Sequence, residues 1–303
     1  MDWHVSNSDI NHLISRPTSR CCAYCKRIFE VKLKPMKAII AGTDFTPSSQ
    51  NACRYAALLA LKLNCKLTIF NLFQAPVLHS NSGLYGISYM SVKKTSEKQV
   101  DEFIKDLVKE FPSLKISALT TTGAFEEELE VFVARHKVAA VVMGLQAKDR
   151  ISRFIYGSHG VKVAGKINAP VIIVPERYKD HRLETILLAV DNAEKLKNSS
   201  LKLLEAFSTN TQSQVKLLHV RTPEEVLSPR ETSFVKINKS PVEVKVVRSK
   251  TIENGIRNFC SDKQTDLVTV ISKKHSVLYN LFNESVTKRV CFTANVPVLA
   301  IHE

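Results

Sequence analysis

Long apolar runs are missing from this chain of 303 residues. None approaches the roughly 18 consecutive apolar residues that a membrane-spanning helix requires, so we expect no transmembrane segment and no membrane partner. The opening sequence MDWHVSNSDI also lacks the basic start and apolar centre of a secretory signal. Because 44% of the residues are hydrophobic and 24% are charged, the composition is that of a globular protein. These features together predict a cytoplasmic protein.

The motifs of several enzyme classes are missing as well. The sequence contains no G-x-x-x-x-G-K-[ST] phosphate loop, no G-x-S-x-G nucleophile turn and no H-E-x-x-H metal motif. Five histidines stand without an acid or a nucleophile in a recognisable local register: His136, His159, His219, His275 and His302. We therefore expect a protein that is not an enzyme.

Cysteine is also used sparingly, and its seven copies are an odd number. Three of them form the cluster CCAYC at 21–25, with His4 and His12 upstream, but no second ligand pair follows at the spacing of a zinc site. The other four lie in apolar patterns typical of core elements: Cys53, Cys65, Cys260 and Cys291. We expect buried free thiols in a reducing compartment, and no bound metal.

Aromatic residues that could stack on bases are few, with one Trp and seven Tyr, although the net charge is +14. The basic residues are spread along the chain, and no RRM, KH or helix-turn-helix signature accompanies them. A solvated basic surface accounts for this charge better than a nucleic-acid partner does.

The chain contains an internal repeat, in which one pattern of segments occurs twice. Asp44 lies opposite Asp191, each directly after an apolar run. Three pairs of segments carry the match: KAIIAGTDFT (37–46) with TILLAVDNAE (185–194), LTIFNL (67–72) with VKLLHV (215–220), and APVIIV (169–174) with VPVLAI (296–301). Each copy alternates short β-branched runs with amphipathic helices, which indicates βαβ units. The fold class is therefore α/β, with two tandem open parallel-sheet, Rossmann-like domains.

Residues at the ends of the predicted strands mark a candidate ligand crevice. In parallel α/β sheets, ligands bind beyond the carboxyl ends of the strands, where the strand order reverses. Asp44, Asn71 with Leu72, and Gly144 all follow or end such strands. Thr46-Pro47 after the first strand predicts a helix cap followed by proline at the first helical position.

The segment from Val138 to Pro175 reads strand, basic loop, helix and strand. The helix begins at Gly157-Ser158, where free backbone N–H groups and the helix dipole favour an anion. A simple helix cap is the other interpretation of Gly-Ser at this place. Lys148, Arg150 and Arg153 in the loop add positive charge, or form a solvated face.

The second copy departs from the first in two ways. The helical stripe from Val100 to Phe111 has no counterpart, because the matching interval, 221–241, is rich in Pro and Ser. We therefore expect one helix fewer in the second copy, with something else covering that part of its sheet. Eight of the nine glycines also precede residue 182. The positions of Gly144, Ala147 and Gly157-Ser158 correspond to Ile271, Lys274 and Glu284-Ser285. A carboxylate at the helix start repels phosphate, so we expect the second copy to be degenerate and to bind no nucleotide through this loop.

These residues resemble the universal stress protein family, in its tandem two-domain form. Its nucleotide-binding members carry G-x2-G-x9-G-[ST]; this chain has Gly144, then Ala147, then Gly157-Ser158 at the same spacing. Alanine at the second glycine position is costly if that position needs a positive φ, and nearly neutral otherwise. Gly123, at the end of the third strand, also matches a glycine frequent in the family.

The resemblance implies an adenine nucleotide alpha hydrolase-like fold and an adenine nucleotide, ATP with Mg²⁺, as ligand. It places Asp44 against the ribose or adenine, and implies a nucleotide site made of Asp44, Leu72, Met143, Gly144, Ala147, Gly157 and Ser158. It also implies that the strands around 171–174 and 298–301 pair edge to edge, covering exposed strand edges.

The predicted domains are residues 36–178 and 183–303, preceded by an extension, residues 1–35, that is either a disordered tail or an artefact of start-site choice. The predicted function is a cytoplasmic stress-response regulator that binds ATP in its first domain without turnover. The alternatives are a ligand-free protein-interaction scaffold of the same fold, and a slow nucleotide hydrolase or nucleic-acid binder. Protein partners are unknown, and a homodimer remains open beside the intramolecular domain pair.

Overall fold

The computed structural model describes residues 38–74, 84–146, 163, 166–180, 182–190, 196, 198–223, 234–263, 265–272, 290 and 293–302. The chain divides into two units, residues 1–34 and 35–303, and every described residue lies in the second unit. The interpretations of the N-terminal extension therefore concern residues outside the described ones. Among the described residues, no helix is long and apolar enough to cross a membrane, and no group of three or more His, Cys, Asp or Glu side chains could hold a metal ion.

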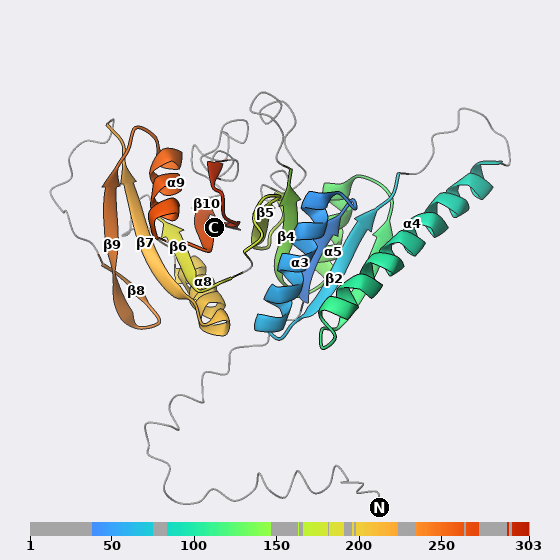
Figure 1. Ribbon diagram of the computed structural model, residues 1–303, viewed down its shortest axis with the longest axis horizontal. Coiled ribbons are helices and arrows are strands. Elements are labelled where there is room, and N and C mark those ends of the chain that lie inside the picture. The colour runs from blue at the N-terminus through green and yellow to red at the C-terminus, as the bar shows by residue number, and fades with distance from the viewer. Residues whose placement is uncertain are drawn as a thin grey trace, which may run out of the picture. The chain divides into compact units, whose positions relative to one another are not determined.

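In the described part of the chain, eleven strands form the sheet, in the order β3-β2-β1-β4-β5-β11-β10-β6-β7-β9-β8 (Figure 1). The first five are β1 (Ala38–Thr43), β2 (Lys66–Leu72), β3 (Ile116–Thr121), β4 (Val138–Leu145) and β5 (Val171–Pro175). The others are β6 (Thr185–Ala189), β7 (Gln214–Arg221), β8 (Phe234–Ile237), β9 (Ser240–Arg248), β10 (Leu267–Ser272) and β11 (Val298–His302). Within each half the neighbouring strands are parallel, apart from β8. The predicted tandem α/β fold is confirmed.

The two halves meet at an antiparallel pair, β5 with β11. Val298 lies opposite Ile173, Leu299 opposite Ile172 and Ala300 opposite Val171. These residues are almost fully buried. The edge-to-edge pairing implied by the resemblance is therefore present, and it removes two strand edges that would otherwise be free to aggregate.

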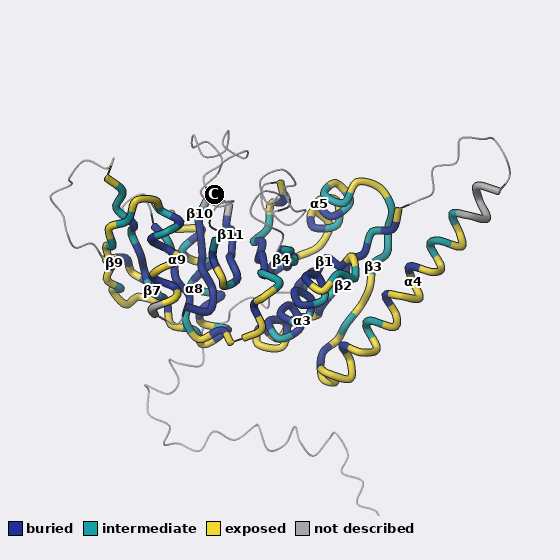
Figure 2. Tube along the Cα trace, turned by 45° about the horizontal axis from the view of Figure 1, so that its top comes forward, coloured by how far each residue is buried: buried dark blue, intermediate teal, exposed yellow. Residues whose placement is uncertain are grey.

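Helices cover both faces of the sheet. On one face α3 (Pro47–Lys62), α4 (Leu84–Glu110) and α8 (Asn198–Thr211) supply core residues such as Ala56, Leu107 and Leu204. On the other face α5 (Phe125–Arg135) and α9 (Ile252–Lys263) supply Leu129 and Phe259. Figure 2 shows buried segments in the central strands and in α3. Cys53, Cys65 and Cys260 are buried free thiols as predicted, whereas Cys291 lies outside the described residues.

A β-hairpin occupies the described part of the interval that has no counterpart to the Val100–Phe111 stripe. β8 and β9 pair antiparallel around Asn238 and Lys239, which both have positive φ, as a type I′ turn requires. Val235 and Ile237 of β8 are buried in the same core cluster as α8. The backbone N–H of Asn238 donates a 2.8 Å hydrogen bond to Oε1 of Glu205 on α8. The hairpin thus extends the second half of the sheet beyond β7 and adds its buried side chains to the core on the α8 face.

Candidate functional site

The end of β1 and the start of α3 form one hydrogen-bonded loop. Thr46 is the N-cap of α3, with Pro47 at the start of the helix, as predicted. The Thr46 backbone N–H donates a 3.1 Å hydrogen bond to Oδ1 of Asp44, and the Thr46 hydroxyl donates to the same oxygen. The backbone N–H of Asp44 donates to the Ser49 hydroxyl, 3.3 Å away. These hydrogen bonds fix Asp44 at the start of the loop, and the residue remains exposed to solvent.

The carboxyl group of Asp44 is ionised at neutral pH. Partial burial raises its pKa, but hydrogen bonds from Thr46 and Ser49 outweigh burial, and the pKa lies below its usual value. The positive end of the α3 dipole favours the same charged form. An ionised carboxylate accepts hydrogen bonds from hydroxyl groups and repels phosphate. Asp44 suits the sugar or base end of a nucleotide, and not its phosphates.

Gly144 near the end of β4 lies against the first turn of α3. A Cβ atom on Gly144 would lie 2.5 Å from the carbonyl oxygen of Ser48 and 2.8 Å from the backbone nitrogen of Ser49. No side chain fits there, because such distances are well inside van der Waals contact. Glycine is required here by the packing of α3 on β4, a reason that motif spacing did not reveal. Since Ser49 also bonds Asp44, the helix start brings Asp44 and Gly144 together.

Met143 and Leu72 have different positions relative to the loop. The Met143 side chain is 6% exposed and belongs to the core on the α5 face. Its Sδ lies 2.6 Å from the place that a Cβ on Gly42 would take, so Met143 offers a ligand its backbone alone. Leu72 ends β2, one strand beyond β1, and is half-buried opposite Thr121.

A buried polar pair supports the end of β1 from the side. Asn71 on β2 donates a 2.9 Å hydrogen bond from Nδ2 to the carbonyl oxygen of Thr43. The Ser96 hydroxyl on α4 donates a 2.7 Å bond to Oδ1 of Asn71. Sequence reasoning placed Asn71 at a strand end but missed Ser96, because no local pattern links a helix residue to a strand that far back in the chain. In the second half, His219 occupies the place of Asn71, with Nδ1 3.0 Å from the carbonyl oxygen of Val190.

The structure thus brings Asp44, Leu72, Met143 and Gly144 to the ends of three adjacent strands, β2, β1 and β4. The remaining predicted site residues, Ala147, Gly157 and Ser158, lie outside the described residues. The basic loop residues lie outside them as well: Lys148, Arg150 and Arg153. β2 and β4 lie on opposite sides of β1, so the strand order reverses at β1, where open α/β sheets bind ligands.

The model of the universal stress protein family matches residues 36–175. These residues belong to that family. The match ends at the last residue of β5, so it covers the half of the chain that holds the candidate site. Among curated proteins, none matches the chain in sequence.

Solved structures extend the likeness of fold to both halves. A universal stress protein from Archaeoglobus fulgidus has a TM-score of 0.65 and 15% identity, and the match covers 88% of this chain and 96% of that chain. A putative universal stress protein from Pseudomonas aeruginosa has a TM-score of 0.53 and 9% identity, with 89% and 94% covered. A universal stress protein solved in complex with cAMP is 20% identical at a TM-score of 0.36, and covers 46% of this chain and 97% of its own. For the first two structures, at these identities, the likeness concerns the fold alone.

Proposed function

We propose that this protein is a cytoplasmic stress-response regulator that binds an adenine nucleotide, ATP with Mg²⁺, in its first domain. One observation carries the proposal: an ionised Asp44 is fixed beside Gly144 at the strand ends where the order of the sheet reverses. The family contributes the stress-response role. The cAMP complex of another universal stress protein belongs to that protein, and the proposal rests on the residues of this chain.

The charge of Asp44 determines which end of the nucleotide binds next to it. The residue is exposed, and its carboxylate can accept hydrogen bonds from the two ribose hydroxyls. The same charge keeps phosphates away, toward the loop that follows β4 and leads to Gly157-Ser158. Phosphates at the helix start that the sequence predicts for Gly157-Ser158 would meet backbone N–H groups and the positive dipole end. A Mg²⁺ ion that binds with the nucleotide would neutralise phosphate charge.

The proposal includes binding without turnover. Asp44 is a poor general base, because its lowered pKa makes it reluctant to accept a proton at neutral pH. Its Oδ1 is already occupied by both donors of Thr46. The carboxylate is thus suited to holding a hydroxyl group and not to activating water.

Native mass spectrometry with Mg²⁺-ATP tests the proposal, on the wild type, Asp44→Ala, Gly157→Glu and the control Asp106→Asn. Asp106 is an exposed acid on α4 paired with Lys109 at 2.9 Å, far along the chain from the loop. We expect one nucleotide per chain in the wild type and in Asp106→Asn, and a Kd raised about tenfold or more in Asp44→Ala. Gly157→Glu, which copies Glu284 of the second half, should bind none. The bound nucleotide should remain ATP after prolonged incubation.

Two results would count against the proposal. Equal binding by Asp44→Ala and Asp106→Asn would remove Asp44 from the site. No bound nucleotide in any of the proteins would favour the second candidate function, a ligand-free interaction scaffold, for which alanine at position 147 is the supporting observation. The search would then turn to protein partners.

A further inference from the structure

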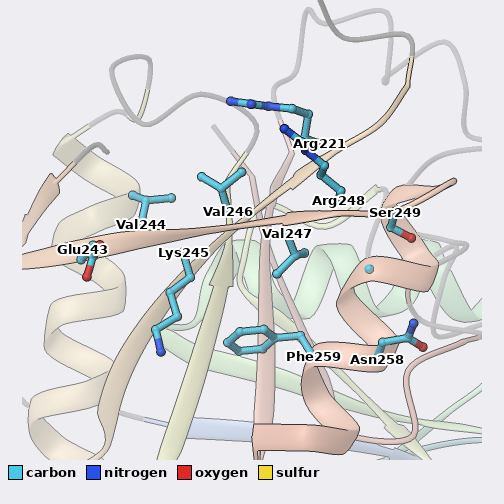
Figure 3. A pocket seen from close by; sticks show the side chains of 11 residues that line it. Arg221, Glu243, Val244, Lys245, Val246, Val247, Arg248, Ser249, Asn258 and Phe259 are labelled. Atoms are coloured by element: carbon cyan, nitrogen blue, oxygen red, sulfur yellow. The ribbon is translucent and has the colours of Figure 1, made fainter. Parts of the chain in front are cut away.

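A groove runs along β9 in the second half of the sheet, away from the candidate nucleotide site. Its volume is about 660 Å³, within the range of protein ligand sites. It is lined by the consecutive residues 243–249 of the strand and its end, by Gly255, Asn258 and Phe259 of α9, and by Arg221 of β7 (Figure 3). A cavity lined by seven consecutive residues follows the strand itself, so an extended chain fits its form.

The backbone of β9 changes partners along its length. β8 pairs with β9 from Ser240 to Glu243, and the described residues contain no strand that pairs beyond that point on this side. On the other side β9 pairs with β7 up to Arg248, and the Ser249 N–H donates to the carbonyl oxygen of Arg221. Since successive residues of a strand point their backbone groups to opposite sides, Val246 and Arg248 point theirs away from β7. Because no strand of the described residues pairs with them there, their N–H and C=O groups form an edge that can accept another strand.

The charges around this edge are mainly positive. Arg221, Lys245 and Arg248 line the groove against a single carboxylate, Glu243. In the part of the chain that the structure describes, no ion pair includes any of these four residues. Carboxylates on an incoming chain would therefore meet cations that no carboxylate of the described residues neutralises.

Successive side chains of β9 point to opposite sides of the strand, so the positive charges are divided between the two sides. Lys245 and Val247 lie on the side of β9 where Phe259 lies, and Val246 lies on the opposite side (Figure 3). Val246 is 37% exposed, although it is apolar. Each side thus offers an apolar residue and a cation, with Arg248 beside Val246. A strand added here would place side chains alternately on the two sides, each next to a positive charge.

We propose that the groove binds an extended acidic segment of a partner protein, which adds to the edge of β9 as a further strand. Backbone hydrogen bonds to Val246 and Arg248 hold the segment, and its carboxylates pair with Arg221, Lys245 and Arg248. This docking site is separate from the proposed nucleotide site and needs no nucleotide.

Fluorescence anisotropy with the full-length protein tests the proposal, in the absence of nucleotide. The probe is a fluorescein-labelled peptide of alternating glutamate and valine, and the matched control alternates lysine and valine. We expect saturable binding of the acidic peptide and none of the basic one. The double variant Lys245→Glu with Arg248→Glu should raise the Kd at least about tenfold, or 1.4 kcal/mol. Val246→Pro, which removes an edge N–H, should lose binding, whereas Val246→Ala should keep it.

Hydrogen exchange on the unmutated protein provides a test that does not depend on the folding of variants. In the free protein, the amides of Val246 and Arg248 should exchange faster than the amide of Val247, which faces β7, and the acidic peptide should slow them. Protection of Val246 and Arg248 without peptide would mean that the chain itself already pairs this edge, and would overturn the proposal. Binding of both peptides alike, binding of neither, or unchanged binding by Val246→Pro would overturn it too.

Discussion

The Nδ2 atom of Asn71 lies 2.9 Å from the carbonyl oxygen of Thr43, and His219 makes the equivalent contact with Val190 at 3.0 Å. In both halves, the second strand of the sheet thus holds the carbonyl group at the end of the first strand. In the first half that carbonyl group directly precedes Asp44. The contact fixes the backbone from which the candidate ligand-binding carboxylate extends.

Replacing Asn71 should therefore destabilise the first half. Asn71→Ala leaves the Thr43 carbonyl group and the Ser96 hydroxyl without their buried partner, which costs about 1–3 kcal/mol. His219→Asn keeps a donor of the type found in the first half, and should change stability by less than about 1 kcal/mol. Urea unfolding followed by circular dichroism measures both. Equal stability of Asn71→Ala and the wild type would show that the bond contributes nothing.

Gly144 should not tolerate even one additional carbon atom. Gly144→Ala places a Cβ 2.5 Å from the Ser48 carbonyl oxygen, so α3 must move, at a cost of about 1–3 kcal/mol. Because the clash involves backbone atoms, the added change Ser48→Ala should not relieve it. Thermal unfolding of the single and double variants checks this. Rescue by Ser48→Ala would place the clash on the side chain and contradict the packing described above.

Tyr178, between the two halves, should be important for stability. Its carbonyl oxygen accepts a 2.8 Å hydrogen bond from Asn51, and its ring packs edge-on against Tyr55 with centroids 6.3 Å apart. The hydroxyl makes a long 3.4 Å contact with the carbonyl oxygen of Asp266. Tyr178→Ala should cost about 3–5 kcal/mol, as large aromatic truncations do. Tyr178→Phe should cost at most about 1.5 kcal/mol, because the hydroxyl bonds that it removes, to Asp266 and to the carbonyl oxygen of Arg182 at 3.5 Å, are long. Denaturant titration of the two variants separates the contribution of the ring to the free energy of unfolding from that of the hydroxyl group.

Asp44 should give the stability of the protein a specific dependence on pH. Its folded pKa lies below the value of 3.8 expected for an unperturbed group, so its contribution is present above that pH and is lost as pH falls through the folded pKa. Asp44→Asn removes this contribution. The difference in Tm between wild type and Asp44→Asn should be greatest at neutral pH and should shrink below about pH 4. A difference that grows on acidification would have the wrong sign.

The strands could be predicted from the sequence because buried parallel strands are short apolar runs, and the repeat supplied each run twice. The seam of β5 with β11 followed from the resemblance. The β8–β9 hairpin was missed, since its turn, Asn238-Lys239, lacks the glycine that usually marks two residues of positive φ. The alternation of FVKI and VEVKVV was the available signal.

The candidate site was predictable only where it depends on residues next to strand ends. Asp44 follows an apolar run, and Gly144 interrupts one, so both could be named. Their environment depends on contacts between distant segments. Ser96 reaches Asn71 from a helix, and Ser48 approaches Gly144 through the packing of α3 on β4. Neither contact leaves a periodic trace in the sequence, because one hydrogen bond or one close approach needs only a single residue on each side.

The antiparallel pair of β5 with β11 also affects which substitutions the sequence of this protein can accumulate. In an assembly of two identical chains, every substitution appears on both sides of the shared interface. Here the two sides are encoded separately, so each can vary while the other stays constant. One side can keep a glycine beside its first helix while the other carries isoleucine at the matching place. A second copy of the chain would have to join through a surface other than these two strands, since each already has a neighbour on both sides.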